Sequence, residues 1–168
     1  VGMIVHGILA ESMNNSPTLM LRNVNYVKKV IFPLEIMPWV VMGSTLFHAL
    51  ISVVVWSLFY IVVNYSFQWT AVFLPLVLIP LVLFSLGVSW ALASLGVYIR
   101  DIGQMTGVLT TILLFMSPVF YPASRLPEPY QTIIYLNPLT FVIEQARDVL
   151  MWGNVPNWSG LVVAYIVS

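Results

Sequence analysis

The chain has 168 residues, of which 60% are apolar, 14% aromatic and only 7% charged, and its six basic and six acidic residues give no net charge. No Lys, Arg, Asp or Glu occurs in 36–99 or in 102–124, and an apolar run of about 18 residues is already long enough to cross a bilayer. This pattern excludes a soluble domain, and the lack of net charge argues against a nucleic-acid-binding protein. The lack of cysteine excludes disulfides and thiolate metal sites.

The charged residues outline the order of segments along the chain. Because an ionised group at the bilayer centre costs roughly 2.5–3.5 kcal/mol on insertion scales, we expect the charged clusters to lie outside the hydrocarbon. The predicted order is the end of one span at 1–10, a cytoplasmic loop at 11–36, spans at 37–63, 71–99 and 102–121, an external hairpin at 122–154 and the start of a last span at 155–168. Since both ends of the sequence are apolar, we interpret it as an internal part of a longer chain.

The predicted fold class is all-α, a polytopic helical membrane protein. Only helices and closed barrels satisfy their backbone hydrogen bonds in lipid, and this sequence lacks the repeated alternating strands of a barrel. Basic residues orient the spans. The first loop carries Arg22, Lys28 and Lys29 and the next loop on the same side carries Arg100, so the positive-inside rule places both loops in the cytoplasm. The segment 122–154 then lies outside although it also contains two arginines, so the rule supports this part of the topology least.

The first cytoplasmic loop has a pattern typical of an amphipathic helix over 17–32. Ser16 and Pro17 suit the N-cap and N1 positions, and Pro33 ends the pattern. Apolar residues recur at helical spacing along one face, namely Met20, Val24, Val27 and Ile31. Such a helix can lie on the membrane surface or dock into a cytoplasmic partner, and the periodicity alone favours the surface.

The third and fourth spans carry small residues at helical spacing. Ser85, Ser89 and Ala93 recur every four residues, and Gly103 and Gly107 form a G-x-x-x-G pattern. Small side chains at this spacing let helix backbones approach closely, so we expect both spans to pack against other helices. A chance pattern in helices rich in small residues is the alternative.

The external segment begins where two prolines interrupt the fourth span. We predict a short helix over 130–136 and a second helix that starts at Asn137 and Pro138, in the N-cap and N1 positions, and stops at Gly153. One face of the second helix is apolar and comprises Leu139, Val142, Ala146 and Val149. Two helices this short indicate a re-entrant hairpin in the outer leaflet, with surface-lying helices as the alternative.

Charged residues of the second external helix lie on another face. Glu144 and Arg147 are three residues apart, so their side chains can pair. No enzyme pattern accompanies them, because the sequence has no G-x-x-x-x-G-K-[ST], H-E-x-x-H or G-x-S-x-G motif. His48 lies within a span and is expected to be satisfied by a neighbouring helix. We therefore expect no catalytic residue, metal site or cofactor in this chain.

Five short motifs follow one another along the sequence. They are Asn15-Ser-Pro-Thr-Leu19, Tyr98-Ile-Arg-Asp-Ile102, Met116-Ser-Pro-Val-Phe-Tyr-Pro122, Leu136-Asn-Pro-Leu-Thr140 and Glu144-Gln-Ala-Arg147. Together they resemble the permease subunits of bacterial ABC exporters for polysaccharides, most closely the lipopolysaccharide O-antigen branch, with capsule and teichoic-acid exporters as near relatives. The resemblance covers essentially the whole sequence and implies six spans per subunit, of which this chain runs from the end of the second into the sixth.

The resemblance also implies partners and a mechanism. Two permease subunits would form the channel, and separate ATPase subunits, which bind ATP and Mg, would lie beneath it. The helix over 17–32 would then be the coupling helix, which changes the preference from the membrane surface to docking on the ATPase. Movement of the ATPase subunits would separate the spans, so that a lipid-linked glycan crosses the bacterial inner membrane. The lipids of that membrane would surround the subunits.

The resemblance implies three groups of functional residues. The ATPase contact comprises Arg22, Tyr26, Lys28, Lys29, Arg100 and Asp101. The external gate comprises Phe120, Tyr121, Pro122, Asn137, Pro138, Glu144 and Arg147. Sugars offer flat C–H faces and hydroxyls, so channel lining is expected from aromatic side chains, for which the candidates are Trp56, Tyr60, Trp90, Tyr98 and Phe115. These aromatics can equally serve packing or an interface belt, and the loop cations can instead bind the lipid diphosphate.

Two other functions compete with glycan export. One is an ABC permease for another substrate, such as capsule, teichoic acid, a drug or a lipid. The other is a membrane scaffold that only recruits a cytoplasmic protein through the 17–32 helix. An ion-driven transporter is not favoured, because no acidic residue lies within a predicted span.

Overall fold

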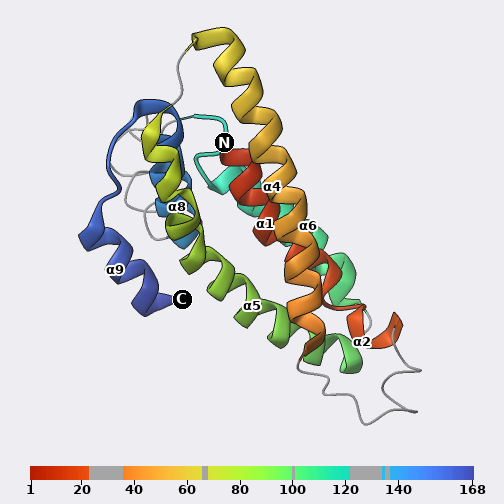
Figure 1. Ribbon diagram of the computed structural model, residues 1–168. Helices are drawn as coiled ribbons and strands as arrows, with labels where there is room; N and C mark the ends of the chain where they lie inside the picture. Colours follow the sequence, from red (N-terminus) through yellow and green to blue (C-terminus); the bar gives the residue numbers. More distant parts are fainter. Residues whose placement is uncertain (23–35, 66–67, 100, 122–133, 135–136) are drawn as a thin grey trace.

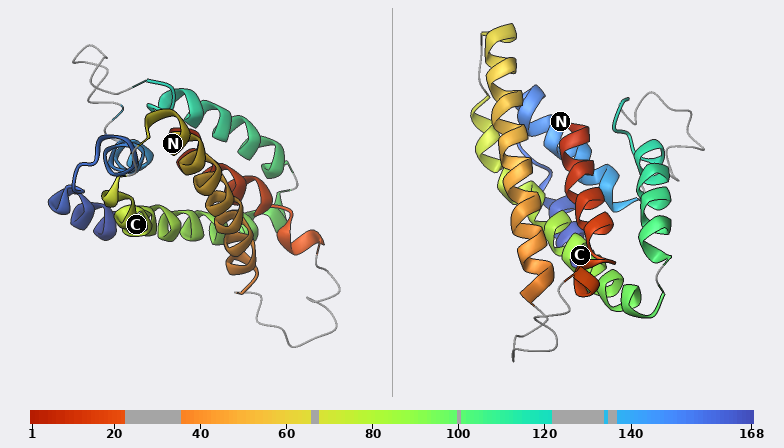
Figure 2. Two further views of the ribbon diagram at one scale, coloured as in Figure 1. Left: turned by 45° about the horizontal axis from the view of Figure 1, so that its top comes forward. Right: turned by 90° about the vertical axis from the view of Figure 1, so that its right-hand side faces the viewer.

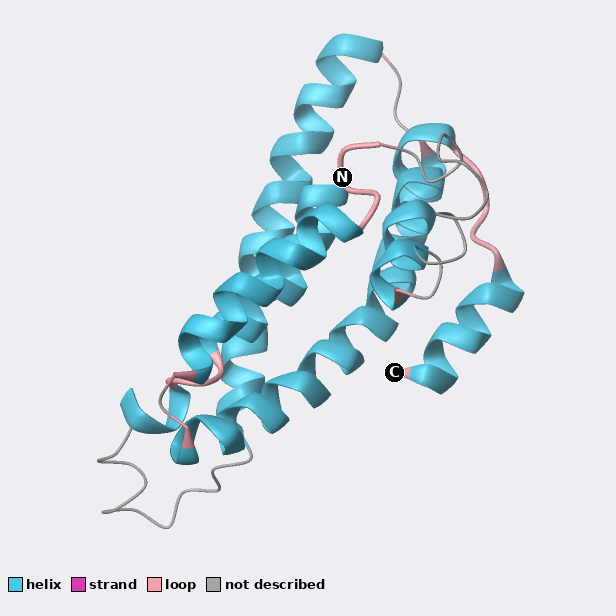
Figure 3. Ribbon diagram, turned by 180° about the vertical axis from the view of Figure 1, so that it is seen from behind, coloured by secondary structure: helices cyan, strands magenta, loops and turns pink. Residues whose placement is uncertain are grey.

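The computed structural model describes residues 1–22, 36–65, 68–99, 101–121, 134 and 137–168. Every regular element in this part of the chain is helical, as Figure 3 shows, in agreement with the predicted all-α class. The α-helices are α1 (Gly2–Asn15), α2 (Leu19–Arg22), α4 (Met37–Asn64), α5 (Leu74–Tyr98), α6 (Ile102–Met116), α8 (Pro138–Arg147) and α9 (Trp158–Val167). A 3-10 turn, η2 (Trp69–Phe73), precedes α5, and a π-helical turn, η4 (Asp148–Trp152), follows α8.

Within the described ranges, two segments are long and apolar enough to cross a membrane, judged by length and composition. They are Met37–Asn64, with 28 residues, and Trp69–Tyr98, with 30 residues, which correspond to about 42 and 45 Å at the helical rise of 1.5 Å per residue. Only five of the residues in α4 are buried, so this helix turns most of its apolar side chains outward. An apolar surface of this extent suits lipid and not water.

Helix α1 lies at the centre of the bundle. It packs against α4, α5, α6 and α8, and two further views show the longer helices around it (Figure 2). The long helices run in alternating directions, so their ends gather at two ends of the bundle (Figure 1). The end that holds η4, the C-terminus of α4 and the start of α5 corresponds to the predicted external side. The end that holds α2 and the turn between α5 and α6 corresponds to the predicted cytoplasmic side.

The apolar face of α8 faces the core, as predicted. Leu139, Val142, Ala146 and Val149 are all between 0 and 3% exposed. They belong to the same buried cluster as Val5, Ile8 and Leu9 of α1. Burial of one such side chain is worth roughly 1.5–3 kcal/mol relative to exposure to water. The short helix α8 is therefore held in a fixed position against the centre of the bundle.

Small residues line the contact between α1 and α5. This contact, the α1–α5 seam, comprises Ser12, Ser16, Ser85, Ser89, Ala93 and Gly96. The hydroxyls of Ser16 and Ser89 lie 2.6 Å apart, and a Cβ on Gly96 would lie only 2.1 Å from the carbonyl oxygen of Pro17. The predicted close packing of the third span is therefore confirmed. The G-x-x-x-G pattern of α6 differs, because a Cβ on Gly107 would meet nothing within 4 Å in the described part of the chain.

The start of the loop helix differs from the prediction. Helix α1 continues to Asn15 and α2 begins at Leu19 rather than Pro17. The hydroxyl of Ser16 donates to the carbonyl of Ser12 at 2.5 Å, a backward bond within the preceding helix that competes with capping. The predicted N-cap role of Ser16 is therefore wrong, and the predicted coupling helix beyond Arg22 lies outside the described residues.

Candidate functional site

Arg147 fastens the turn after α6, residues 117–121, to helix α8. Its Nη1 donates to the carbonyl of Tyr121 at 3.1 Å and its Nη2 to the carbonyl of Val119 at 2.6 Å. Hydrogen bonds from a charged donor are roughly twice as strong as neutral ones. Two predicted gate residues, Tyr121 and Arg147, therefore meet, and they do so through the backbone of the turn.

Asn137 binds the same turn at the other end of α8. Its Oδ1 accepts from the backbone N–H of Leu139 at 3.0 Å, so the predicted N-cap, with Pro138 as the first helical residue, is confirmed. Its Nδ2 donates to the hydroxyl of Ser117 at 3.0 Å, and Ser117 is fully buried. One side chain thus starts the helix and holds the turn. The sequence analysis assigned Asn137 to the gate but missed its partner Ser117.

The start of α1 closes the back of this cluster. A Cβ on Gly2 would lie 2.8 Å from the carbonyl oxygen of Val119 and 3.2 Å from Nη2 of Arg147. Phe120 is 62% exposed, whereas Pro122 lies outside the described residues. The turn is therefore held between α1 and α8 and presents one aromatic side chain at the surface.

Two influences act on the guanidinium of Arg147. Burial lowers its pKa, and the carboxylate of Glu144 one turn earlier raises it. Arginine remains protonated under both influences. The predicted interaction of Glu144 with Arg147 is thus electrostatic, and the hydrogen bonds to Val119 and Tyr121 were not anticipated.

Side chains of two other elements, η2 and α4, are hydrogen-bonded to the π-helical turn η4. The hydroxyl of Thr70 donates to the carbonyl of Val149 at 2.6 Å, and that of Tyr60 donates to the carbonyl of Met151 at 3.2 Å. Gly153 ends the turn with a φ of +67°, a conformation that suits glycine, which confirms the predicted stop. The end of α4 on the predicted external side and the turn η2 before α5 are therefore bonded to the predicted gate segment.

The predicted ATPase-contact residues gather at the α2 end as far as they are described. Asp101 is the residue before α6 and is exposed. A Cβ on Gly103 would lie 3.9 Å from Thr18, so the start of α6 lies beside the turn that leads into α2. Outside the described part fall the side chain of Arg22 and the residues Tyr26, Lys28, Lys29 and Arg100.

The aromatic side chains predicted to line a channel occupy separate places. Trp56 and Tyr60 stack one turn apart on α4 with ring centroids 5.0 Å apart. Trp90 makes an edge contact with a tryptophan at the start of α4. Tyr98 and Phe115 are 85% and 68% exposed, at the C-terminal ends of α5 and α6. The structure does not bring the five rings to one surface, so their role as channel lining stays a prediction.

An ionisable pair that the sequence analysis missed links α1 to α4. Nδ1 of His48 lies 2.8 Å from Oε1 of Glu11. The sequence analysis assigned Glu11 to the loop, whereas α1 runs through it to Asn15. The expected satisfaction of His48 by a neighbouring helix is confirmed, although the two residues are too far apart in sequence for any local pattern to pair them. No three His, Asp or Glu residues within the described ranges lie close enough to hold a metal.

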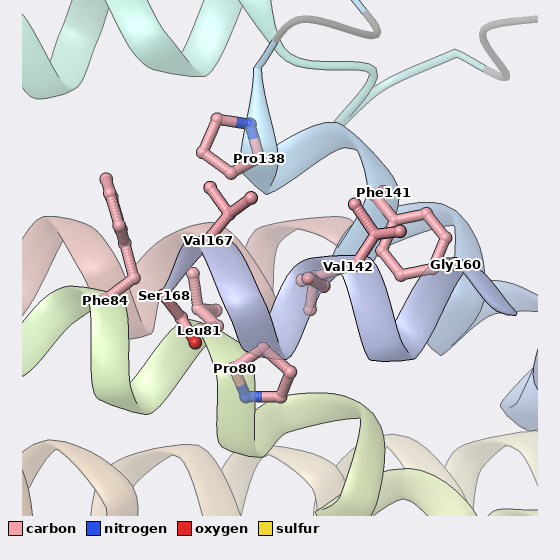
Figure 4. A pocket seen from close by; sticks show the side chains of 11 residues that line it. Pro80, Leu81, Phe84, Pro138, Phe141, Val142, Gly160, Val167 and Ser168 are labelled. Carbon is pink, nitrogen blue, oxygen red and sulfur yellow. The ribbon is translucent and has the colours of Figure 1, made fainter. Parts of the chain in front are cut away.

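An apolar cavity of about 420 Å³ lies between α5, α8 and α9 (Figure 4). Pro80 and Phe84 of α5 line one side, and Phe141 of α8 stands against Gly160 of α9, where a Cβ would lie 2.5 Å from the ring. Among the described residues, the walls are apolar apart from Ser168 and carry no charged side chain. Two polar clusters of the described chain contain a charged side chain bonded to another segment. They are the Arg147 cluster (Ser117, Val119, Tyr121, Asn137 and Arg147) and the Glu11–His48 pair.

A model of the ABC-2 type transporter family matches residues 1–151. This chain belongs to that family. With two helices of membrane-crossing length, this ABC-2 family member is a membrane protein.

Among its relatives are permease proteins of ABC transport systems. An O-antigen export system permease protein from Klebsiella pneumoniae is 30% identical over 161 residues, which is 95% of this chain and 61% of that protein. A protein of the same description from Myxococcus xanthus is 24% identical over 142 residues, 83% of this chain and 55% of that protein. A daunorubicin resistance ABC transporter permease protein from Streptomyces coeruleorubidus is 32% identical over 90 residues, 51% of this chain and 31% of that protein. The chain thus spans less than two thirds of the length of each of these relatives.

Proposed function

We propose that this chain is part of the permease subunit of an ATP-driven exporter that moves a lipid-linked polysaccharide of O-antigen type across the bacterial inner membrane. The observation that carries the proposal is the similarity of 95% of the chain to an O-antigen export permease. The subunit is a multi-pass homodimer, and separate ATPase subunits bind ATP and Mg, since this sequence has no phosphate-binding loop.

The α2 end provides the mechanical connection to the ATPase. The turn between α1 and α2 packs on α5 without intervening space, because the hydroxyls of Ser16 and Ser89 are 2.6 Å apart and Pro17 lies directly on Gly96. Close-packed interiors have low compressibility and transmit strain. A push on the loop helix therefore displaces α1 and α5 together. The contact itself is assigned to Lys28, Lys29 and neighbouring residues from the family resemblance.

The Arg147 cluster provides the external gate. Opening requires the turn 117–121 to separate from α8, and this breaks the bonds of Arg147 to two carbonyls and the bond of Asn137 to Ser117. Because α8 also packs on α1, a displacement of α1 at the cytoplasmic side reaches the gate through one continuous helix. ATP-driven movement and gate opening are thereby coupled across the bundle.

A second function, export of a drug, competes with glycan export as the role of this permease. The similarity to a daunorubicin resistance permease favours a small apolar drug as the alternative cargo, over a shorter match. An aromatic such as Tyr60 or Phe115 discriminates the two. Its replacement by alanine is expected to reduce export of a long glycan, whereas in a drug permease the same change alters selectivity among drugs.

The test is complementation of export in a bacterial strain that lacks its own O-antigen permease. The full-length subunit and its ATPase partner are expressed together, and surface polysaccharide is measured by immunoblotting of intact cells. Polymer is expected at the surface, and a partner ATPase with a disabled nucleotide site should leave it inside the cell. A correctly inserted subunit that never restores surface polymer but confers drug resistance would contradict the proposal.

A further inference from the structure

The Glu11–His48 pair lies part-way along the bundle rather than at either of its ends. Helix α4 has 28 residues and begins at Met37. At 1.5 Å per residue, His48 lies about 16 Å along the helix from that first residue. Ionisable groups at such a depth face the bundle interior or a water-filled cavity, because exposure to lipid is costly. The side chains of His48 and Glu11 are nevertheless 60% and 31% exposed. Their surroundings must therefore supply water or another polar group.

A cavity of about 220 Å³ lies beside this pair, between α1 and α4. Glu11 and His48 line it together with Thr45 and Ser52. Gly7 leaves its wall open, since a Cβ there would meet no heavy atom of the described residues within 4 Å. At roughly 30 Å³ per water in the liquid, the space is sufficient for several water molecules or for one group of similar bulk.

Thr45 provides an independent sign that the cavity takes a polar ligand. It is 1% exposed, and its hydroxyl has no hydrogen-bond partner in the described structure. A buried hydroxyl without a partner costs roughly 1–3 kcal/mol. A ligand hydroxyl or a water in the cavity would remove that cost. The unpartnered group and the ionisable pair thus border the same space.

The chemistry of the cavity fits hydroxyl groups better than ions. His48 donates from Nδ1 to Glu11, which leaves Nε2 and the second carboxylate oxygen to bind a ligand. Ser52 donates to the carbonyl of His48 at 2.9 Å and can still accept. A sugar ring both donates and accepts through its hydroxyls and packs its C–H faces on apolar walls. The pair offers no excess positive charge for an anion and no third ligand for a metal.

We propose that this cavity is a hydrated binding site for sugar hydroxyls on the transport path, with Glu11, His48 and Thr45 as its binding groups. The identity of the ligand rests on the proposed function, whereas the polarity of the site rests on the geometry. Glu11 orients the imidazole, and Thr45 binds from the buried wall. Successive sugar units exchange hydrogen bonds at this site as the polymer passes.

Cysteine labelling tests the site, because this sequence has no native cysteine. Ser52→Cys places a thiol in the cavity wall and leaves the three binding groups intact. Leu50→Cys is the matched control, since Leu50 is 60% exposed on the opposite face of α4. The full-length subunit, with any cysteine elsewhere replaced, is reconstituted with its ATPase in nanodiscs. A charged maleimide is expected to label Ser52→Cys at least tenfold faster than Leu50→Cys.

Ligand protection then tests the sugar assignment. A short lipid-diphosphate-linked oligosaccharide is expected to slow labelling of Ser52→Cys severalfold, and the same lipid diphosphate without sugar is not. Adding Glu11→Gln or Thr45→Val should weaken this protection while labelling without ligand stays fast.

Three results would overturn the inference. Equal labelling of the two cysteines means that the cavity is dry. Labelling that the oligosaccharide does not slow, or that the bare lipid diphosphate slows equally, means that the site does not take sugar. None of these results bears on the proposed function, whose failure appears separately as absent surface polymer in the complementation assay.

Discussion

Replacing Arg147 by alanine is expected to release the turn 117–121 from α8. The change removes two hydrogen bonds from a charged donor, to the carbonyls of Val119 and Tyr121 at 2.6 and 3.1 Å. Each such bond contributes roughly 1.5–3 kcal/mol. Because both bonds hold one turn and are not additive, we expect a loss of about 3 kcal/mol for the closed state. That shifts a two-state gate by about two powers of ten toward the open form.

The assay is leakage of a small polar solute from vesicles that contain the full-length exporter without ATP. Wild-type vesicles should hold the solute and Arg147→Ala vesicles should lose it. Arg147→Lys is the control, because it keeps the charge and can reach one carbonyl, so its leakage should be intermediate. If the alanine variant is dimeric, inserted and as tight as the wild type, the two carbonyl bonds do not hold the gate.

Two further predictions concern packing and capping. Gly96→Ala would place a Cβ 2.1 Å from the carbonyl oxygen of Pro17, and this overpacking should cost about 1–3 kcal/mol. We expect a lower melting temperature for the purified complex and weaker stimulation of its ATPase. Gly87→Ala should be neutral or slightly stabilising, because its Cβ would meet nothing from the rest of the described chain within 4 Å. Equal melting temperatures for the two variants would refute the reasoning. Asn137→Ala should lose about 1 kcal/mol of capping. Asn137→Asp keeps the cap and replaces the amide donor to Ser117 by an oxygen that can accept from the serine hydroxyl, so an aspartate variant as unstable as alanine would contradict the cap.

Local features of the structure could be predicted because their causes are local. The cap at Asn137, the stop at Gly153 and the buried face of α8 all follow from residues within one helix. The small residues of α5 predicted a close helix contact for the same reason. These patterns do not show which segment packs against α5. Its partners Ser16 and Pro17 come from a segment more than 70 residues away in the sequence.

The polar contacts were harder to predict because backbone groups and distant residues provide the partners. Arg147 was expected to interact with Glu144, its neighbour on α8, but it donates hydrogen bonds to the backbone carbonyls of the turn that follows α6. Glu11 was assigned to the loop by its charge alone. Helix α1 instead runs through Glu11, and the carboxylate lies 2.8 Å from Nδ1 of His48 on α4. A partner on a neighbouring helix lowers the cost of placing an acidic residue among apolar helices.

The most direct test of the exporter account is co-purification of the full-length subunit with its ATPase. The wild type should retain the ATPase through membrane extraction. Arg22→Glu combined with Lys29→Glu, which reverses two charges of the predicted coupling helix, should lose it while the permease stays inserted and dimeric. A wild-type subunit that never captures an ATPase would contradict the account and favour a membrane scaffold.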